Sequence, residues 1–181
     1  MRILLLRHAK SSWDQPGLRD HDRPLAGRGQ RAAPAMGAHF AGTNLRIDRI
    51  ISSTAARALA TARLFREAFD DQTPLTSRRD LFHAGPKTLL SVALEEAGGD
   101  EDSNVMLVGH NPGMHDLARF LCSEGQPGDV ARLNAKFPTG ALAEFDLKSQ
   151  PLAPSQTQLP AGRLVRFVRP KDLATAKELR L

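Results

Sequence analysis

Three short apolar runs, each followed by polar residues and then by a helical pattern, constrain the fold of this chain most strongly. The runs cover residues 3–6, 47–51 and 105–108. Short apolar runs of this kind are typical of strands that are buried in a parallel sheet. The helical patterns that alternate with them cover residues 28–40, 55–69, 86–97 and 114–121. This order predicts an α/β fold, a three-layer sandwich with a mostly parallel central sheet and helices on both faces.

The length of the chain favours a single domain. With 181 residues, 41% of them hydrophobic, the chain can bury one sizeable core, and we expect one domain over residues 1–181. Residues 141–147 and 163–168 predict two further strands, and residues 173–181 predict a short closing helix. The intervening residues 148–162 are polar and rich in proline, so we expect a mobile loop there.

Basic side chains stand where the three apolar runs end. Arg7 and His8 follow the first run, Arg57 lies in the first turn of the helix after the second, and His110 follows the third. Ligands of open parallel sheets bind outside the carboxyl ends of the strands, so we expect these side chains to converge. A cation in the first turn of a helix opposes the helix dipole unless an anion shares the position. We also expect a hydroxyl among residues 52–54 to cap that helix.

These residue types suit a phosphoryl group. A neutral imidazole is a nucleophile near neutral pH, and guanidinium groups fit phosphate oxygens. Fixed donors of this kind can stabilise the charge of a transferring phosphoryl group without a metal. The sequence has no Gly-x-x-x-x-Gly-Lys loop and no carboxylate-rich cluster, and the spacing of His110 and His115 does not suit zinc. We therefore expect neither a metal nor a cofactor.

Three sequence segments resemble the signature segments of the histidine phosphatase superfamily, also called phosphoglycerate mutase-like. They are RHAK at residues 7–10, SxxxRAxxTA at residues 53–62 and VGHNP at residues 108–112. The longer strings RHAKSSW at residues 7–13 and DRPL at residues 22–25 are similar to the small bacterial SixA-type phosphohistidine phosphatases. The resemblance extends over residues 1–120, and the combination of the segments in this order is highly specific.

The resemblance implies a covalent mechanism. His8 would attack phosphorus and become a transient phosphohistidine, while Arg7, Arg57 and His110 hold the phosphoryl oxygens. Water would then release phosphate and restore His8. The attacking nitrogen of His8 must be neutral, with the other ring nitrogen donating to a backbone carbonyl.

Two departures from the wider family bear on the substrate. Members that act on phosphate monoesters commonly have a glycine directly after the nucleophilic histidine, where this chain has Ala9. They also commonly have a glutamate that acts as an acid in the segment that matches residues 81–85, where the nearest candidate in this chain is His83. We consider His83 as the proton donor, and Asp14, Asp20 and Asp22 of the first loop are further candidates. Asp22 fits better as a residue that orders this loop through Arg23 or backbone amides. Phosphohistidine has a weaker P–N bond and a smaller need for an acid.

We therefore expect a metal-independent protein phosphohistidine phosphatase whose partner is a histidine-phosphorylated phosphotransfer domain or phosphocarrier. Relatives that bind small metabolites usually carry a larger insertion over the site, whereas only about 35 residues separate the second predicted helix from the third strand here. The resemblance therefore implies an open site that suits a side chain on another protein. Two alternatives stay open. The chain could be a phosphatase of small phosphate esters, or a phosphate-recognition module without catalysis.

Charge and cysteine content restrict the remaining possibilities. The net charge is +5, but basic residues are spread along the chain, 5% of residues are aromatic and tyrosine is absent, so we expect no nucleic-acid partner. The lone Cys122 favours a reducing compartment and a small buried residue over a nucleophile. The sequence has neither a signal-peptide pattern nor eighteen consecutive apolar residues, so we expect a cytoplasmic protein without a membrane partner.

Overall fold

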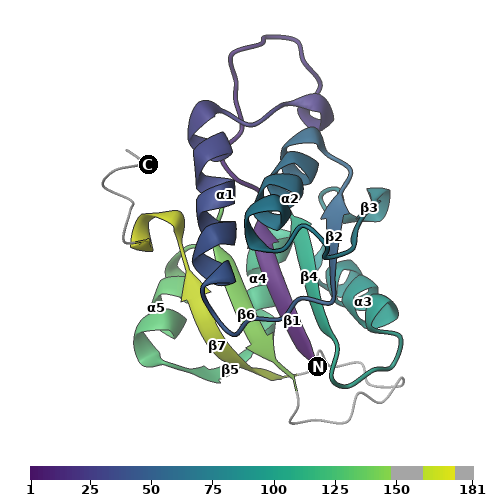
Figure 1. The fold of residues 1–181 in the computed structure, drawn as a ribbon, viewed down its shortest axis with the longest axis vertical. Helices are drawn as coiled ribbons and strands as arrows, with labels where there is room; N and C mark the ends of the chain where they lie inside the picture. The colour runs from purple at the N-terminus through teal and green to yellow at the C-terminus, as the bar shows by residue number, and fades with distance from the viewer. Residues whose placement is uncertain (148–160, 174–181) are drawn as a thin grey trace.

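The computed structural model describes residues 1–147 and 161–173, and one mixed sheet forms their centre (Figure 1). The sheet has seven strands in the order β3-β2-β4-β1-β6-β7-β5. All of them run in one direction except β6, which is antiparallel to both of its neighbours. The strands are β1 Arg2–Arg7, β2 Arg49–Ser53, β3 Leu75–Arg78, β4 Asn104–Gly109, β5 Cys122–Gly125, β6 Leu142–Asp146 and β7 Gly162–Val168.

Helices cover both faces of this sheet, so the predicted three-layer α/β sandwich is confirmed. In Figure 1 the helices α1 and α2 lie in front of the sheet, and α3 and α4 lie behind it. The α-helices are α1 Gly27–Ala41, α2 Ala56–Phe69, α3 Pro86–Ala97, α4 Gly113–Leu121 and α5 Pro127–Ala135. The short 3-10 helices are η1 Asp20–Asp22, η2 Arg79–Leu81 and η3 Pro170–Asp172.

Strand β1 explains why a wholly apolar run is needed at the centre of the sheet. Ile3 and Leu5 belong to the core beneath α3 and α4, while Leu4 and Leu6 belong to the core beneath α1 and α2. All four side chains are almost fully buried. Burying each of them stabilises the fold by roughly 1.5–3 kcal/mol. Because side chains alternate along a strand, both faces of this strand must be apolar.

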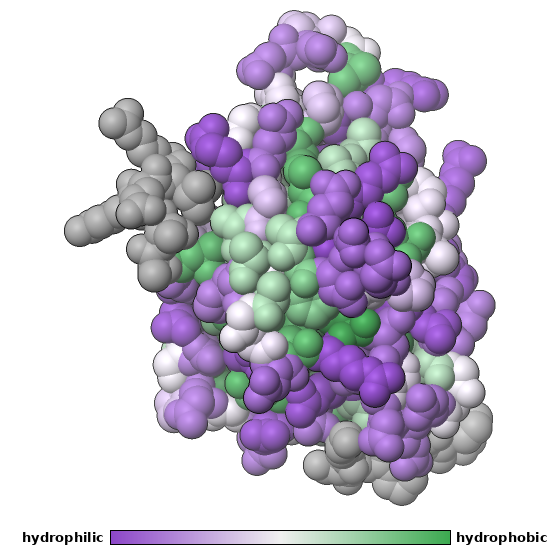
Figure 2. All heavy atoms as spheres, viewed as in Figure 1, coloured by the Kyte–Doolittle hydropathy of each residue, from purple (hydrophilic) through white to green (hydrophobic). Residues whose placement is uncertain are grey.

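A glycine brings α1 and α2 into close contact. A Cβ atom on Gly37 would lie 2.2 Å from the carbonyl oxygen of Phe65 in α2, so a larger residue would push the helices apart. The face in Figure 2 shows weakly hydrophobic residues gathered near the middle of the molecule, between hydrophilic residues. Among the described residues, no helix is long and apolar enough to cross a membrane.

Several elements differ from the sequence-based expectation. The structure adds strands β3 and β5 and helix α5, which lack a strong apolar pattern. The expected hydroxyl cap of α2 is wrong, because the N-cap is Ala55 and no side chain caps the helix. The loop expected at residues 148–162 lies outside the described residues up to residue 160, and so does the helix expected at residues 173–181 beyond Leu173.

Candidate active site

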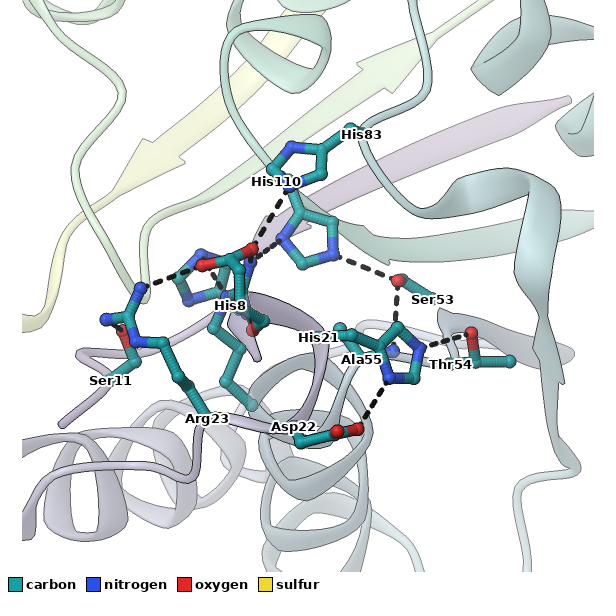
Figure 3. Close-up of polar contacts among 12 residues, drawn as sticks. His8, Ser11, His21, Asp22, Arg23, Ser53, Thr54, Ala55, His83 and His110 are labelled. Carbon is teal, nitrogen blue, oxygen red and sulfur yellow. Dashed lines mark hydrogen bonds and ion pairs between the residues drawn. The ribbon is translucent and has the colours of Figure 1, made fainter. Parts of the chain in front are cut away.

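Four residues from three strand ends lie at the carboxyl edge of the sheet, and Figure 3 shows two of them, His8 and His110. Arg7 ends β1 and His8 follows it, Arg57 is the second residue of α2, and His110 follows β4. The Nε atom of Arg57 lies 3.4 Å from Nε2 of His8, and one of its terminal nitrogens lies 3.4 Å from Nδ1 of His110. The His8 and His110 rings are 5.1 Å apart. The structure therefore brings together the four residues that the sequence indicated.

His8 is held as a neutral imidazole with one free lone pair. Its Nδ1 lies 2.8 Å from the carbonyl oxygen of Ala9, and a carbonyl only accepts, so Nδ1 carries the hydrogen. Nε2 then keeps its lone pair and faces Arg57. Burial and, to a smaller extent, the charges of Arg57 and Arg7 together lower the pKa of His8 to about 4, although the hydrogen bond to Ala9 acts in the opposite direction. The ring is thus unprotonated at neutral pH.

Thr61 ties the loop that carries His8 to α2. Its Oγ1 accepts a hydrogen bond from the backbone N–H of Ala9 at 3.0 Å and donates one to the carbonyl of Arg57 at 2.7 Å. The side chain is fully buried. Sequence reasoning assigned Thr61 no role, although it lies in the segment that resembles the family signature. Its position fixes the spacing between His8 and Arg57.

The carboxylate of Asp20 forms an ion pair with the guanidinium group of Arg57. Its Oδ2 accepts a hydrogen bond from Arg57 at 2.8 Å, and its backbone carbonyl accepts another from the same guanidinium. Arg23 donates to Oδ1 at 2.8 Å, and Nε2 of His83 lies 3.2 Å from Oδ2. Partial burial alone would raise the pKa of Asp20, but hydrogen bonds from Arg57, His83 and Arg23 lower it to about 2. Asp20 is therefore a carboxylate at neutral pH.

His110 is also neutral, and its partner Ser53 can either accept or donate the hydrogen bond between them. Burial, together with the nearby His8, Arg57 and His83, lowers the pKa of His110 to about 3. Because guanidinium groups only donate, the contact with Arg57 makes Nδ1 an acceptor, and Nε2–H donates to Oγ of Ser53 at 2.9 Å. A hydroxyl can equally donate to Nε2. Ser53 therefore allows His110 to present an Nδ1–H donor to an anion in the site.

Arg7 is held by the backbone on the other side of His8. One of its terminal nitrogens donates to the carbonyl of Phe137 at 2.8 Å, and Asn111 donates to the same oxygen at 3.0 Å. The Nε atom of Arg7 is buried and has no hydrogen-bond partner among the described residues. Burial lowers the pKa of its guanidinium below the ordinary value. Arg7 thus offers a fixed positive charge with unused donor capacity.

His83 lies at the exposed rim of the site. Its ring centroid is 5.2 Å from that of His110, and its side chain is 52% exposed. The backbone has a φ of 53°, a left-handed conformation that is uncommon for a residue other than glycine. The structure thus places His83 close enough to the polar centre to meet a bound ligand.

Asp20, and not Asp22, is the partner of Arg23 in the first loop, which corrects the sequence-based interpretation. Asp22 contacts Arg19 and His21 instead of Arg23, and His21 reaches Oγ1 of Thr54 at 3.0 Å. Arg23 pairs with Asp20, donates to Ser11 at 2.7 Å and stacks on the exposed ring of Trp13. Asp14 is exposed and bonds Ser12. Thr54, just after β2, thus bonds to the first loop, and Ser53, the last residue of β2, bonds to His110.

The donor set of the site suits an oxyanion. Within residues 1–147 and 161–173, no group of three or more His, Cys, Asp or Glu side chains is placed to hold a metal ion. The site instead combines two guanidinium groups with neutral imidazoles whose lone pairs are directed by their partners. Such an arrangement can bind a dianionic phosphoryl group and accept it on nitrogen.

Comparison with known proteins gives the family. The sequence model of the histidine phosphatase superfamily (branch 1) matches residues 3–82. An uncharacterized protein of Mycobacterium tuberculosis is 37% identical over 142 residues, which cover 76% of this chain and 84% of that protein. The crystal structure of a proposed phosphohistidine phosphatase SixA from Agrobacterium tumefaciens is 33% identical, with a TM-score of 0.74 over 93% of this chain and 97% of that one.

A further solved structure, the protein histidine phosphatase SixA complexed with tungstate, shares the fold. It has a TM-score of 0.74 at 22% identity and covers 96% of this chain and 99% of its own. The sequence match and the structural match at 33% identity point to the same family. The chain belongs to the histidine phosphatase superfamily, in its SixA-type branch.

Proposed function

We propose that this protein is a metal-independent phosphatase that removes phosphate from phosphohistidine on a partner protein through His8. The observation that carries the proposal is the state of that ring: Nδ1 donates to Ala9, and Nε2 keeps a lone pair that faces Arg57. Membership of the superfamily supports phosphatase chemistry. The SixA relative from Agrobacterium tumefaciens supports phosphohistidine as the substrate.

The first step transfers the phosphoryl group to the enzyme. The phosphoryl oxygens take the place of the Asp20 carboxylate on Arg57, with Arg7 and His110 as further donors. Nε2 of His8 forms a bond to phosphorus as the P–N bond of the substrate breaks. The electron pair of that bond stays on the substrate imidazole, which takes up a proton. The charge that spreads over the equatorial oxygens is stabilised by donors that are already in place.

The second step releases phosphate. Because Nδ1 keeps its hydrogen on the Ala9 carbonyl, the phosphorylated ring of His8 carries a positive charge. A cationic ring is a good leaving group, so water attacks phosphorus, the Nε2–P bond breaks, and its electron pair returns to Nε2. The attacking water loses a proton to solvent. His8 is then neutral again, with its original tautomer.

The ionised state of Asp20 favours a nitrogen leaving group. A carboxylate whose pKa is about 2 carries no proton to donate at neutral pH. An alkoxide needs a proton from a general acid far more than an imidazole does, and the loss of such an acid costs about a hundredfold or more. We assign proton donation to His83, whose Nε2 contacts Asp20 in the free protein and becomes available when phosphate replaces that carboxylate.

A substrate panel tests the proposal. The wild-type protein and His8→Ala are each incubated with a histidine-phosphorylated protein, a sugar phosphate and a nucleotide. We expect phosphate release from the phosphohistidine protein by the wild type alone, with a radiolabelled phosphoenzyme trapped by alkaline quenching. Equal rates for His8→Ala would refute the nucleophile. A preference for the sugar phosphate would favour the phosphatase of small esters, and tight binding without turnover would favour a recognition module.

A further inference from the structure

A basic pocket lies beside the loop that carries His8. It has a volume of about 300 Å³, and its charged lining residues are Lys10, Arg28, Lys136, Arg169 and Lys171. They come from four separate places: the loop after β1, the first turn of α1, the end of α5 and the segment around η3. The fold therefore gathers basic residues that are far apart in the sequence.

The pocket shares its wall with the active site. Lys10 is two residues after His8, and Pro138 and Thr139 also line the pocket. The next residue, Gly140, donates its N–H to the carbonyls of Arg7 at 3.0 Å and His8 at 3.2 Å. Arg57 and His110 approach His8 from the side of β2 and β4, whereas the pocket lies on the side of β6. A molecule with its phosphoryl group at His8 can thus reach over this pocket.

Within residues 1–147 and 161–173, most of the positive charge of the pocket has no paired carboxylate. Arg169 pairs with Asp172 through two contacts of 2.8 Å. The other four basic side chains have no carboxylate partner among the residues that the structure describes. Like charges that line one concave surface repel each other and raise the local potential, which attracts anions from solution.

The composition of the lining indicates what kind of anion fits. The remaining lining residues are Ala32, Pro138, Thr139 and Pro170, so no aromatic ring is available to stack a nucleotide base. Three of the cations are lysines on the surface, which are flexible point charges and make no rigid fork for one phosphate. Such a surface suits carboxylates whose positions vary, as on the acidic face of a folded protein.

We propose that this basic pocket receives aspartate and glutamate side chains of the partner protein next to its phosphohistidine. This inference rests on the proposed function, because it names the surface that the phosphorylated partner presents. The pocket then selects partners by charge and speeds their encounter, while the residues around His8 perform the chemistry. A small phosphoramidate has no acidic surface and does not use the pocket.

The test compares two sets of charge-removing substitutions. The pocket variant is Arg28→Gln/Lys136→Gln/Lys171→Gln, and the control is Arg63→Gln/Lys87→Gln/Arg119→Gln, which removes three exposed charges outside the pocket. With a histidine-phosphorylated protein that has acidic residues around the site, we expect the pocket variant to lose about tenfold in kcat/KM, mostly at low salt. The control and the wild type should hydrolyse it alike, and all three should hydrolyse phosphoramidate equally.

Two further measurements separate this inference from the proposed function. The partner is changed so that acidic residues around its phosphohistidine become amides, which should remove the difference between wild type and pocket variant. Binding of poly-L-glutamate is measured by fluorescence anisotropy and should weaken in the pocket variant alone. If that binding is lost as expected but no phosphohistidine is hydrolysed, the pocket stands and the proposed function falls. Equal kcat/KM for wild type and pocket variant, or an equal loss in the control, overturns the pocket.

Discussion

The carboxylate of Asp20 lies on the guanidinium of Arg57, with Oδ2 2.8 Å from a terminal nitrogen, while Nε of the same guanidinium faces Nε2 of His8. The free protein therefore holds a carboxylate close to His8. A phosphoryl group that binds to Arg57 has to replace this carboxylate or share the guanidinium with it.

Removing this negative charge should tighten phosphate binding. In Asp20→Asn the competing charge is absent, and we expect the inhibition constant for inorganic phosphate to fall about fivefold, equivalent to about 1 kcal/mol of removed repulsion near the surface. Asp14→Asn, which alters an exposed carboxylate of the same loop, is the matched control. Product inhibition measured at constant ionic strength checks this. An unchanged constant in Asp20→Asn would show that Asp20 does not compete with phosphate.

The protonation of His8 should occur far below the usual range. Its pKa is lowered to about 4, so Nε2 keeps its lone pair down to that pH, and activity that depends on it should be lost only as the pH falls through about 4. A titration of the His8 ring by NMR gives the midpoint directly, with the exposed His39 as an internal reference. A midpoint near 6.5 for His8 would contradict the buried, neutral ring.

The same shift has a consequence for stability. An unfolded chain binds a proton on this histidine near pH 6.5, whereas the folded protein does so only near pH 4. The contribution of the neutral ring to the free energy of unfolding is therefore complete above pH 6.5 and declines as the pH falls toward 4. His110, whose pKa is lowered to about 3, acts in the same direction. Denaturant unfolding of the wild type and His110→Asn at several pH values measures the difference.

The effect of substituting His83 on the rate should depend on how much the leaving group needs a proton. We expect His83→Gln to slow hydrolysis of protein phosphohistidine about threefold, since the leaving imidazole has a small need for a proton, and to leave p-nitrophenyl phosphate, whose leaving anion needs none, unchanged. His39→Gln serves as control because that ring is exposed on α1. Steady-state rates on both substrates provide the comparison. An equal loss on both would assign His83 to binding and not to proton transfer.

Thr61 should couple stability and activity. Thr61→Val keeps the shape but leaves the Ala9 N–H without its partner, so we expect a loss of about 1–3 kcal/mol in the free energy of unfolding and a lower kcat. Thr61→Ser should restore kcat, because the hydroxyl returns. Thr88→Val, at an exposed position of α3, should change neither quantity. Restored stability without restored kcat in Thr61→Ser would separate the two roles.

The sequence predicted the central strands because they are buried on both faces and therefore wholly apolar. Strands β1 and β4 are of this kind, and the residues that follow them form the site. Strand β3 pairs with β2 alone at the edge of the sheet, and the side chains of Thr76 and Ser77 are exposed. An edge strand of this type leaves no apolar pattern, and the same holds for β5.

Contacts between distant loops explain what sequence reasoning missed at the site. Asp20 and Arg57 are 37 residues apart, and neither neighbourhood shows that they pair. The hydroxyls after β2 were expected at the helix cap, but Ser53 serves His110 and Thr54 serves His21. The preference of hydroxyl residues for helix N-caps applies when no other hydrogen-bond partner is within reach. The basic pocket was missed for the same reason. Its basic residues are far apart in the sequence, and only the fold brings them together.

The hydrogen bond between Nδ1 of His8 and the carbonyl of Ala9 has a consequence for how such a protein can diversify. Many enzymes orient a reactive histidine with a carboxylate from a remote part of the chain, so that change in one place disturbs the other. Here the tautomer is selected by the adjacent peptide group. Substitutions in the surrounding walls can therefore change which molecules fit the site, while His8 keeps its proton on the same atom.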